Sequence, residues 1–341
     1  MDVEGTFVKI RRIAKICAII SVLCLCLQLT GCGGGERLKV GFFPNITHSQ
    51  ALCGISLGTF DKALGEALSI GWYGFNAGPS AMESMRAGHI DIAYIGPVPA
   101  ISGYETTDGG IKIIAGVTSG GSLLVARRDS GVESVEDLGG KMVAVPQFGN
   151  TQDILLRGLL DDAGLAPIDD GGNVQIVQQA NANIKLLLEN GSIDAALVPE
   201  PWGSAMEAAG CVVVLDSDDI MAGDYPVAVL VVRTEYLDEH RDSVKLFLEQ
   251  HIATTRRIND ETDYCATVAN DAIGRLTGIS LEADVLSKAF DRMGVDYTVD
   301  LGAIDRFIDI CRSQGLIRGD MTAEMVCDTS VLEEILAEQN D

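Results

Sequence analysis

Basic side chains are scarce in this chain of 341 residues. It has 25 lysines and arginines against 49 aspartates and glutamates, which gives a formal net charge of −24. A surface of that sign repels a phosphate backbone, so we expect no nucleic acid partner. Aromatic residues are also few, at 5%, whereas glycine is abundant, at 38 residues. This composition favours a globular protein of strands and helices joined by tight turns.

The cysteines form no recognisable framework. Four of the nine lie at or before Cys32, and the five that follow contain no Cys-x-x-Cys pair. An odd, widely spaced set disfavours a disulfide framework and a metal site. Cys311 is in phase with the apolar residues Ile304, Phe307 and Ile308, so we expect its side chain in the core. No nucleophile is paired with a base in any motif, and we expect neither an enzyme nor a cofactor.

The N-terminal segment has the features of an export signal. Four basic residues between positions 9 and 15 precede an apolar run, 16–27, which is too short to span a membrane comfortably. The sequence Leu29-Thr30-Gly31-Cys32 has the form of a lipobox, in which cleavage precedes Cys32 and its thiol is lipidated. We therefore expect a lipoprotein signal peptide at 1–31 and a flexible tether at 32–37. An uncleaved signal anchor is the alternative, and both place the chain outside the cytoplasm, anchored to the cell membrane.

A faint internal repeat divides the chain. The strand-like segments 38–44 and 141–146 each end at a proline, and these prolines are 102 positions apart. The segment 88–93, Gly-His-Ile-Asp-Ile-Ala, matches 191–196, Gly-Ser-Ile-Asp-Ala-Ala, at an offset of 103. Each glycine suits the left-handed residue that ends a helix, and the apolar runs 92–95 and 195–198 indicate buried strands. Each copy thus predicts strand, helix, strand, helix, strand in a mainly parallel sheet flanked by helices.

Two such units predict an α/β protein with two lobes. We place the first crossing between lobes at Gly120-Gly121 and the return in the β-branched run 226–233. Residues 38–121 and 227–341 then form lobe I, and residues 122–226 form lobe II. Beyond about residue 235 the spacing is helical, at 244–258, 281–293 and 301–313, with Asp300 as an N-cap. This helical tail is expected to pack on lobe I, and the crossing strands form a hinge beside a cleft.

Five loops should reach that cleft, because ligands of open α/β sheets bind beyond the carboxyl ends of the strands. Three loops open helices with short polar residues, namely Thr47 and Ser49, Ser80, and Asn150 with Thr151. Helix starts can hold an anionic group through free N–H groups, although simple capping is the alternative for each residue. The candidate ligand-binding residues are Asn45, Thr47, His48, Gly78, Pro79, Ser80, Gly96, Pro97, Ser119, Gly149, Asn150, Thr151, Gln152, Glu200 and Trp202.

Three of these side chains leave alternatives open. His48 is either a donor to an anionic oxygen or ring nitrogen of the ligand, or an ordinary hydrogen-bonded histidine. Trp202 either packs the lobes together or forms a wall for the bound molecule. Glu200 opposes an anion unless it is protonated or turned away, so it favours a hydrogen-bond-donating ligand or a structural role.

At these residues the chain resembles the solute-binding proteins of aliphatic sulfonate, taurine and nitrate ABC importers. The resemblance covers residues 38 to about 235, and its best matches are the segments 78–80, 87–93, 95–97, 135–141, 150–151 and 193–202. It implies a type II periplasmic-binding fold of the Venus flytrap type, no catalysis, a small anionic solute, and a membrane permease and ATPase as partners. We expect a monomer.

The first loop departs from that group. Pro44-Asn45-x-x-His48 is similar to the loop of proteins that bind pyrimidine thiamine precursors, so such a heterocycle is the alternative ligand. Some relatives of that branch are enzymes with a cysteine-rich motif, and no such cluster is present here. A sensor ectodomain is a further alternative.

Overall fold

The computed structural model describes residues 36–65, 68–223 and 225–339. The expected signal peptide, the lipobox residue Cys32 and most of the expected tether lie outside the described residues. Residues from Arg37 onward form one compact unit. In the described part of the chain, no helix has the length and apolar character needed to cross a membrane.

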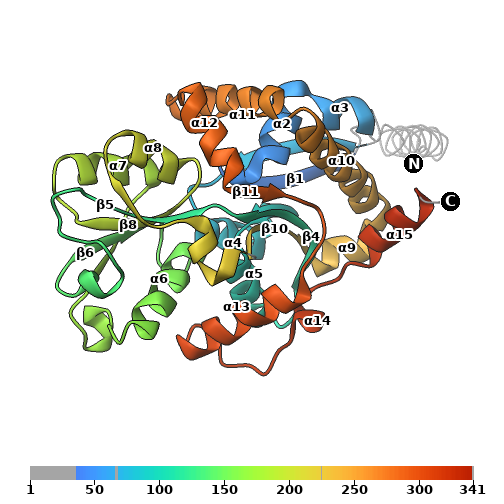
Figure 1. Ribbon diagram of the computed structural model, residues 1–341. Coiled ribbons are helices and arrows are strands. Elements are labelled where there is room, and N and C mark those ends of the chain that lie inside the picture. The colour runs from blue at the N-terminus through green and yellow to red at the C-terminus, as the bar shows by residue number, and fades with distance from the viewer. Residues whose placement is uncertain (1–35, 66–67, 224, 340–341) are drawn as a thin grey trace, which may run out of the picture. The chain divides into compact units, whose positions relative to one another are not determined.

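A six-stranded sheet has the order β11-β4-β10-β3-β1-β2 (Figure 1). Its strands are β1 (Glu36–Phe42), β2 (Leu68–Gly74), β3 (Ile92–Ile95), β4 (Ile111–Gly120), β10 (Pro226–Arg233) and β11 (Met293–Val295). The connecting helices are η1 (Ile46–His48), α2 (Ser49–Leu57), α3 (Thr59–Leu64), α4 (Gly78–Arg86) and α5 (Pro97–Thr106). Strands β1 and β3 are parallel, whereas β10 is antiparallel to β3 and β4. We call this sheet with its helices, residues 36–120 and 226–339, the six-stranded half.

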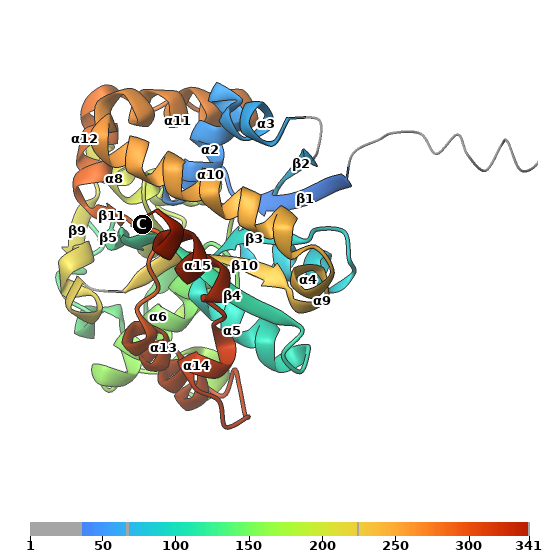
Figure 2. The same cartoon turned by 90° about the vertical axis from the view of Figure 1, so that its right-hand side faces the viewer.

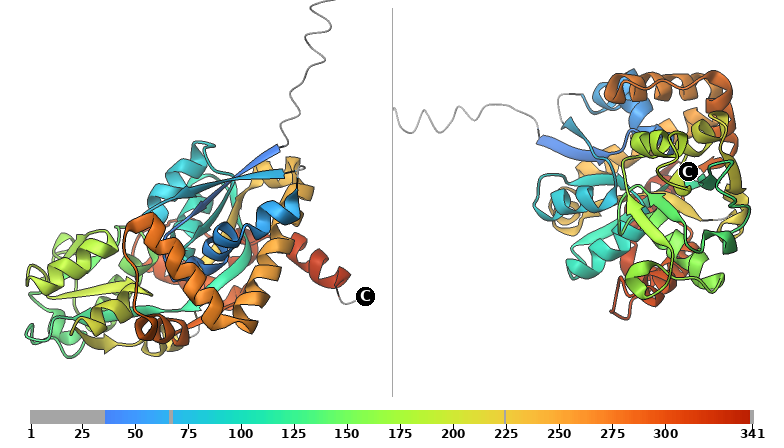
Figure 3. Two further views of the ribbon diagram at one scale, coloured as in Figure 1. Left: turned by 90° about the horizontal axis from the view of Figure 1, so that it is seen from above. Right: turned by 90° about the vertical axis from the view of Figure 1, so that its left-hand side faces the viewer.

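The second sheet has five strands in the order β7-β6-β8-β5-β9. They are β5 (Ser122–Ala126), β6 (Met142–Val145), β7 (Gln175–Gln178), β8 (Ala195–Pro199) and β9 (Val212–Leu215). Its helices are η2 (Glu136–Leu138), α6 (Thr151–Asp162), η3 (Ile168–Asp170), α7 (Asn181–Glu189), α8 (Trp202–Ala208), η4 (Ser217–Asp219) and η5 (Met221–Gly223). Strand β6 is parallel to β7 and β8, and β5 is antiparallel to β8 and β9. We call residues 122–223 the five-stranded half, which is green to yellow in Figure 3.

The chain passes between the sheets twice. The first passage follows β4, where Gly120 and Gly121 have φ angles of +67° and +73°, a conformation that strains other residues. The second passage runs from β9 through η4 and η5 into β10. Each passage therefore connects a strand of one sheet with a strand of the other, the first through Gly121 and the second through η4 and η5.

The repeat predicted from the sequence is confirmed in the secondary structure. Strand β3 spans 92–95, and all four of its residues are buried; β8 covers 195–199 and is also buried throughout. Gly88 and Gly191 end their helical segments with φ angles of +70° and +76°. The two expected sheets are present, but they are mixed: β1 with β3, and β6 with β7 and β8, pair in parallel, whereas β10, β11 and β5 pair antiparallel with their neighbours.

The residues after 233 are mostly helical, as predicted. They form α9 (Thr234–Glu239), α10 (Arg241–Asp260), α11 (Thr262–Thr277), α12 (Ala283–Asp291), α13 (Leu301–Ser313), α14 (Ala323–Val326) and α15 (Ser330–Glu338). Asp300 caps α13 by accepting a hydrogen bond from Ala303 N at 3.1 Å, and Cys311 is fully buried, as expected. The prediction was wrong at Met293, which belongs to the edge strand β11 beside β4, and it missed α11.

Helices α10 and α11 pack with α2 on the six-stranded sheet (Figure 2). Apolar residues of α10, including Phe247 and Leu248, share one core with Leu38 and Val40 of β1. Two later tail helices also reach the other half, since α12 contacts α8 and α13 contacts α6. The tail thus packs on the six-stranded sheet and also contacts helices of the five-stranded half.

Candidate ligand-binding site

A small cavity lies where loops from both halves meet. Its volume is about 30 Å³, which is room for about one or two water molecules. The lining residues of the six-stranded half are Phe43, Asn45, Thr47, His48, Gly78, Gly96, Pro99 and Val227, and those of the five-stranded half are Asn150, Thr151, Gln152 and Pro199. Eight of the fifteen candidates from the sequence are in this set. The loops beyond the carboxyl ends of β1, β3, β6 and β8 therefore converge.

The two halves approach closely at this cavity. A Cβ atom on Gly96 would lie 2.1 Å from Thr151 Oγ1, so position 96 has no space for a side chain. Trp202 Nε1 donates a hydrogen bond to Asn45 Oδ1 at 2.8 Å, and both residues are buried. Trp202 does not line the cavity but joins the halves beside it. The structure thus shows the halves closed against each other.

His48 is held in one tautomer at the cavity wall. It is 2% exposed, and its Nδ1 accepts a hydrogen bond from Phe43 N at 3.1 Å. Burial lowers the pKa of His48 to about 3, so the ring is neutral at ordinary pH. A neutral ring whose Nδ1 accepts carries its proton on Nε2, which makes Nε2 a hydrogen-bond donor.

The start of α6 supplies the opposite wall. Asn150 caps the helix, since its Oδ1 accepts from Asp153 N at 2.8 Å, and its Nδ2 donates to Gln152 Oε1 at 3.0 Å. Gln152 Nε2 in turn donates to Ser122 Oγ at 3.1 Å. Thr151 is 2% exposed, yet its Oγ1 has no hydrogen-bond partner. A buried hydroxyl without a partner is unusual, and here it lines the cavity.

For the other polar loop residues, the alternative of simple helix capping is wrong. Helices α2, α4 and α6 do begin at the expected loops, but only Asn150 caps with its side chain. Ser80 Oγ donates to Ala77 O at 2.8 Å instead. Ser49 Oγ is fully buried and has no partner, and Thr47 contributes its backbone oxygen as acceptor for Thr118 Oγ1 at 2.9 Å.

The remaining candidates lie around the cavity rather than in it. Pro79 and Gly149 come from opposite halves and line a neighbouring groove of about 230 Å³ together with the exposed Phe148. Pro97 is the buried first residue of α5. Ser119 lines a separate cavity of about 110 Å³ between β4, β10 and the segment 296–300.

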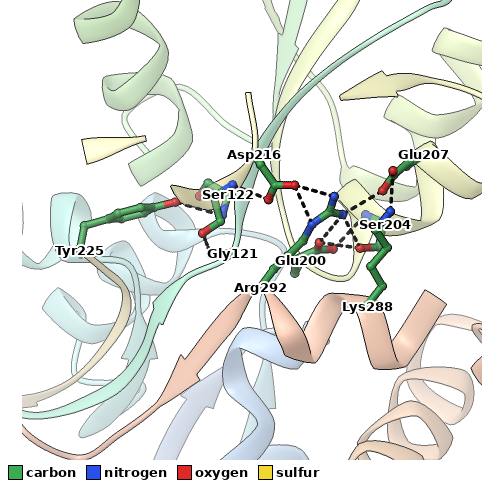
Figure 4. A network of polar contacts seen from close by, with 10 residues as sticks. Gly121, Ser122, Glu200, Ser204, Glu207, Asp216, Tyr225, Lys288 and Arg292 are labelled. Carbon is green, nitrogen blue, oxygen red and sulfur yellow. Dashed lines mark hydrogen bonds and ion pairs between the residues drawn. The ribbon is translucent and has the colours of Figure 1, made fainter. Parts of the chain in front are cut away.

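Glu200 is turned into a network of polar contacts (Figure 4). It is fully buried, and its carboxylate accepts from Ser204 N at 2.9 Å and from Ser204 Oγ at 2.6 Å. Burial raises the pKa of Glu200, while the hydrogen bonds from Ser204 and the charge of Arg292 oppose that rise. Its neighbour Pro199 lines the cavity, but Glu200 does not.

Arg292 is the centre of that network, and sequence reasoning missed it. It follows α12 in the tail and reaches acceptors of the five-stranded half: Glu200 at 3.4 Å, Glu207 at 3.0 Å and Asp216 at 2.7 Å. Its side chain is only 10% exposed. Lys288 adds an exposed ion pair with Glu207. The signal in the sequence was a basic residue placed within an acidic tail, but its partners are far away in sequence.

The sequence is similar to those of known binding proteins. The taurine-binding periplasmic protein of Escherichia coli K12 is 29% identical over 57% of this chain and 58% of its own length. A putative aliphatic sulfonates-binding protein of the same organism is 29% identical over 44% of this chain and 46% of its own length. The matched region thus spans about half the length of these curated relatives.

Solved structures share the fold at low sequence identity. The alkanesulfonate-binding protein of Xanthomonas axonopodis pv. citri, bound to MOPS, superposes with a TM-score of 0.73 at 17% identity, covering 86% of this chain and 98% of that one. The periplasmic nitrate-binding protein of Synechocystis PCC 6803 gives 0.69 at 14% identity, covering 89% of each chain. These matches show the two-sheet α/β fold of periplasmic binding proteins. A family model matches residues 34–271, most of the chain, and this protein belongs to the NMT1-like family.

Proposed function

We propose that this protein is the extracytoplasmic solute-binding component of an ABC importer. Its solute is a small anion of the sulfonate, taurine or nitrate type, bound between the two halves. The observation that carries the proposal is the convergence of His48 and Thr151 from opposite halves on one cavity. The names of the taurine-binding and sulfonates-binding relatives support the same class of solute.

The chemistry of the cavity favours an anion. His48 Nε2 is a donor, Thr151 Oγ1 has no partner, and the start of α6, a helix of 12 residues, adds positive dipole potential. None of the twelve lining residues has a charged side chain. Neutral donors bind an anion without the cost of burying a second full charge. The proposed role is binding without catalysis.

Closure of the two halves provides the signal for transport. We propose that residues 38–121 with 227–341, and residues 122–226, are lobes that rock about the two passages between the sheets. A solute that contacts both lobes favours the closed state by its higher affinity for that state. The permease would then recognise the closed surface, while a lipid on Cys32 keeps the monomer near its permease and ATPase on the outer face of the membrane.

The test is a thermal-shift screen of the purified protein. Sulfonates, taurine, nitrate, bicarbonate and pyrimidines form the panel, because a ligand of the native state raises the melting temperature. We expect a rise with one of the anions and a smaller radius of gyration in solution scattering. A response to pyrimidines alone would replace the proposed solute class. No compaction with any ligand that binds would contradict the closure model.

Variants then assign the site. His48→Ala and Thr151→Val should each weaken binding about tenfold or more, since each removes one hydrogen bond to a charged ligand. Asn150→Ala is a poorer probe than these two variants. Asn150 caps α6, so its loss should also destabilise the unliganded protein by about 1 kcal/mol. Unchanged affinity in both His48→Ala and Thr151→Val would remove this cavity from the binding site.

A further inference from the structure

Cys53 and Cys265 lie against each other in the core of the six-stranded half, although they are 212 positions apart. Cys53 is in the middle of α2, Cys265 is in the first turn of α11, and both are fully buried. The Cys53 thiol donates to Cys265 O at 3.4 Å. The two side chains are also close enough for each to shift the pKa of the other.

The other three cysteines of the described residues behave differently. Burial is the main reason that the pKa values of Cys211, Cys311 and Cys327 are raised, and no thiol contributes to any of these shifts. Sequence spacing did not single out a pair, because Cys53 and Cys265 come from opposite ends of the chain. The fold alone brings these two thiols together.

Helices α2 and α11, which carry the two cysteines, pack against each other. A disulfide requires α-carbons within about 7 Å, so the two helices must approach closely. Small buried residues favour such an approach, since Ala51 of α2 and Ala266 and Ala269 of α11 belong to the same apolar core. The two helices are in direct contact.

The two thiols also differ in acidity. The Cys53 side chain and the nearby Arg257 guanidinium lower the pKa of Cys265, whereas the Cys265 side chain and burial raise the pKa of Cys53. Cys265 is therefore the better source of a thiolate, and thiolates are the attacking groups in disulfide exchange.

We propose that Cys53 and Cys265 are joined by a disulfide in the exported protein. The proposal rests on the extracytoplasmic location proposed above, where disulfides persist. The oxidant is a small or protein-borne disulfide. The Cys265 thiolate attacks one of its sulfurs and releases a thiolate; Cys53 then loses its proton and displaces the second thiolate. Two protein thiols are oxidised and one disulfide is reduced to two thiols.

The consequence is a cross-link between the first copy of the repeat and the tail. It closes a loop of about 212 residues, and constraint of the unfolded chain grows with loop length. Reduction of the link should lower the melting temperature by roughly 5–10 °C for a chain of this size.

Mass spectrometry of the full-length protein tests the link. Cells that express the chain are lysed with a thiol-blocking reagent, and the protein is released from membranes with detergent and digested without reductant. We expect a linked peptide pair that contains Cys53 and Cys265 and is two hydrogens lighter than the separate peptides. Blocked thiols at both positions, or a link through Cys211, Cys311 or Cys327, would overturn the proposal.

A second experiment tests whether the two cysteines can pair without export of the protein. The same protein is reduced, unfolded and refolded in a glutathione redox buffer, which requires no export. Absence of the link in both arms shows that the two cysteines do not pair. A link formed only in vitro overturns the disulfide of the exported protein and counts against the proposed location, while the ligand screen tests solute binding independently.

Matched variants complete the test. The double variant Cys53→Ala with Cys265→Ala should have a melting temperature that is insensitive to reductant. Cys211→Ser, which changes a half-buried cysteine outside the pair, should keep the full response to reductant. A response that disappears in Cys211→Ser and persists in the double variant would place the link elsewhere.

Discussion

The two sheets are built from the same arrangement, but each contains one strand from the other's copy of the repeat. Strands β2-β1-β3-β10-β4 correspond in order to β7-β6-β8-β5-β9. Strand β5 follows the first copy along the chain yet lies in the second sheet, and β10 follows the second copy yet lies in the first sheet. The two passages between the sheets are therefore an exchange of equivalent strands.

The correspondence extends to single atoms. Asp91 Oδ2 accepts from Lys39 N at 3.0 Å, and Asp194 Oδ2 accepts from Met142 N at 2.9 Å. Each aspartate also pairs with an arginine at or just beyond the end of an exchanged strand. Arg233 Nη2 lies 2.9 Å from Asp91, and Arg127 Nη2 lies 3.1 Å from Asp194.

The two copies differ in how deeply these aspartates are buried. The Asp91 side chain is 2% exposed, whereas that of Asp194 is 25% exposed. The aspartate is therefore buried in one copy and partly exposed in the other, while the two arginines are similarly exposed, at 21% and 25%. Because the energetic effect of an ion pair depends on its burial, matched substitutions should have unequal effects.

The largest expected effect is that of Asp91→Ala. It leaves the Arg233 guanidinium without its buried partner and Lys39 N without an acceptor, and should cost about 4 kcal/mol of unfolding free energy. The matched Asp194→Ala should destabilise the protein clearly less, because water replaces part of what is lost. Urea unfolding of both variants measures the difference. Equal losses would show that burial does not distinguish the two copies.

Removal of Arg292 should have the next largest effect, because the tail that carries it has no counterpart in the second copy. Arg292→Met leaves the buried Glu200 without its counter-charge and should cost about 3 kcal/mol. Lys288→Met is the control: Lys288 is half exposed and touches Glu207 in the same network, so little change is expected. Solution scattering should also show that Arg292→Met, but not Lys288→Met, populates a more open form.

The loss of stability in mild acid should arise mainly from histidines of the six-stranded half. Position 48 is a histidine, while its repeat equivalent, Asn150, does not titrate. Burial lowers the pKa of His48 to about 3 and that of His251 to about 4, so both are neutral when folded and become charged when unfolded below about pH 6.5. Their contribution is present above pH 6.5 and is lost as the pH falls towards 4 and 3.

For each of these histidines, the unfolding free energy should therefore fall by about 2 kcal/mol between pH 7 and pH 5. Unfolding by urea at the two pH values measures this loss. In His48→Gln the loss should be about half of that in the unsubstituted protein, because His251 remains. A loss unchanged by the substitution would mean that His48 is not held neutral by burial. The carboxylates, including Glu200 with its raised pKa, are the same in both proteins, so their contribution cancels in the comparison.

The sequence predicted the repeat and two crossings between lobes, but not that the strands at the two crossings are equivalent. The Gly-x-Ile-Asp motifs predicted both buried strands and the turns before them, because these are local features. The third match, Arg127 with Arg233, has an offset of 106 instead of 103 and lies in strands that pair with the other sheet, so it was not recognised. Glu200 shows the same limit: its loop was placed near the cleft, but its ion-pair partner Arg292 lies 92 positions further along.

The smallest expected effects come from the two hydroxyls that follow the equivalent residues His48 and Asn150. Ser49 Oγ and Thr151 Oγ1 are both buried without a partner, and Gln50 and Gln152 follow them. Ser49→Ala and Thr151→Val should each leave the stability of the unliganded protein the same or raise it by about 1 kcal/mol, because an unsatisfied polar atom is removed. Thr151 lines the cavity and Ser49 does not, so calorimetric titration should show weaker ligand binding only in Thr151→Val. If both variants bind the ligand equally well, the Thr151 hydroxyl does not contact the ligand. If both bind it weakly, Ser49 also contributes to the binding site. The two copies of the repeat then contact the ligand more equally than the residues that line this cavity indicate.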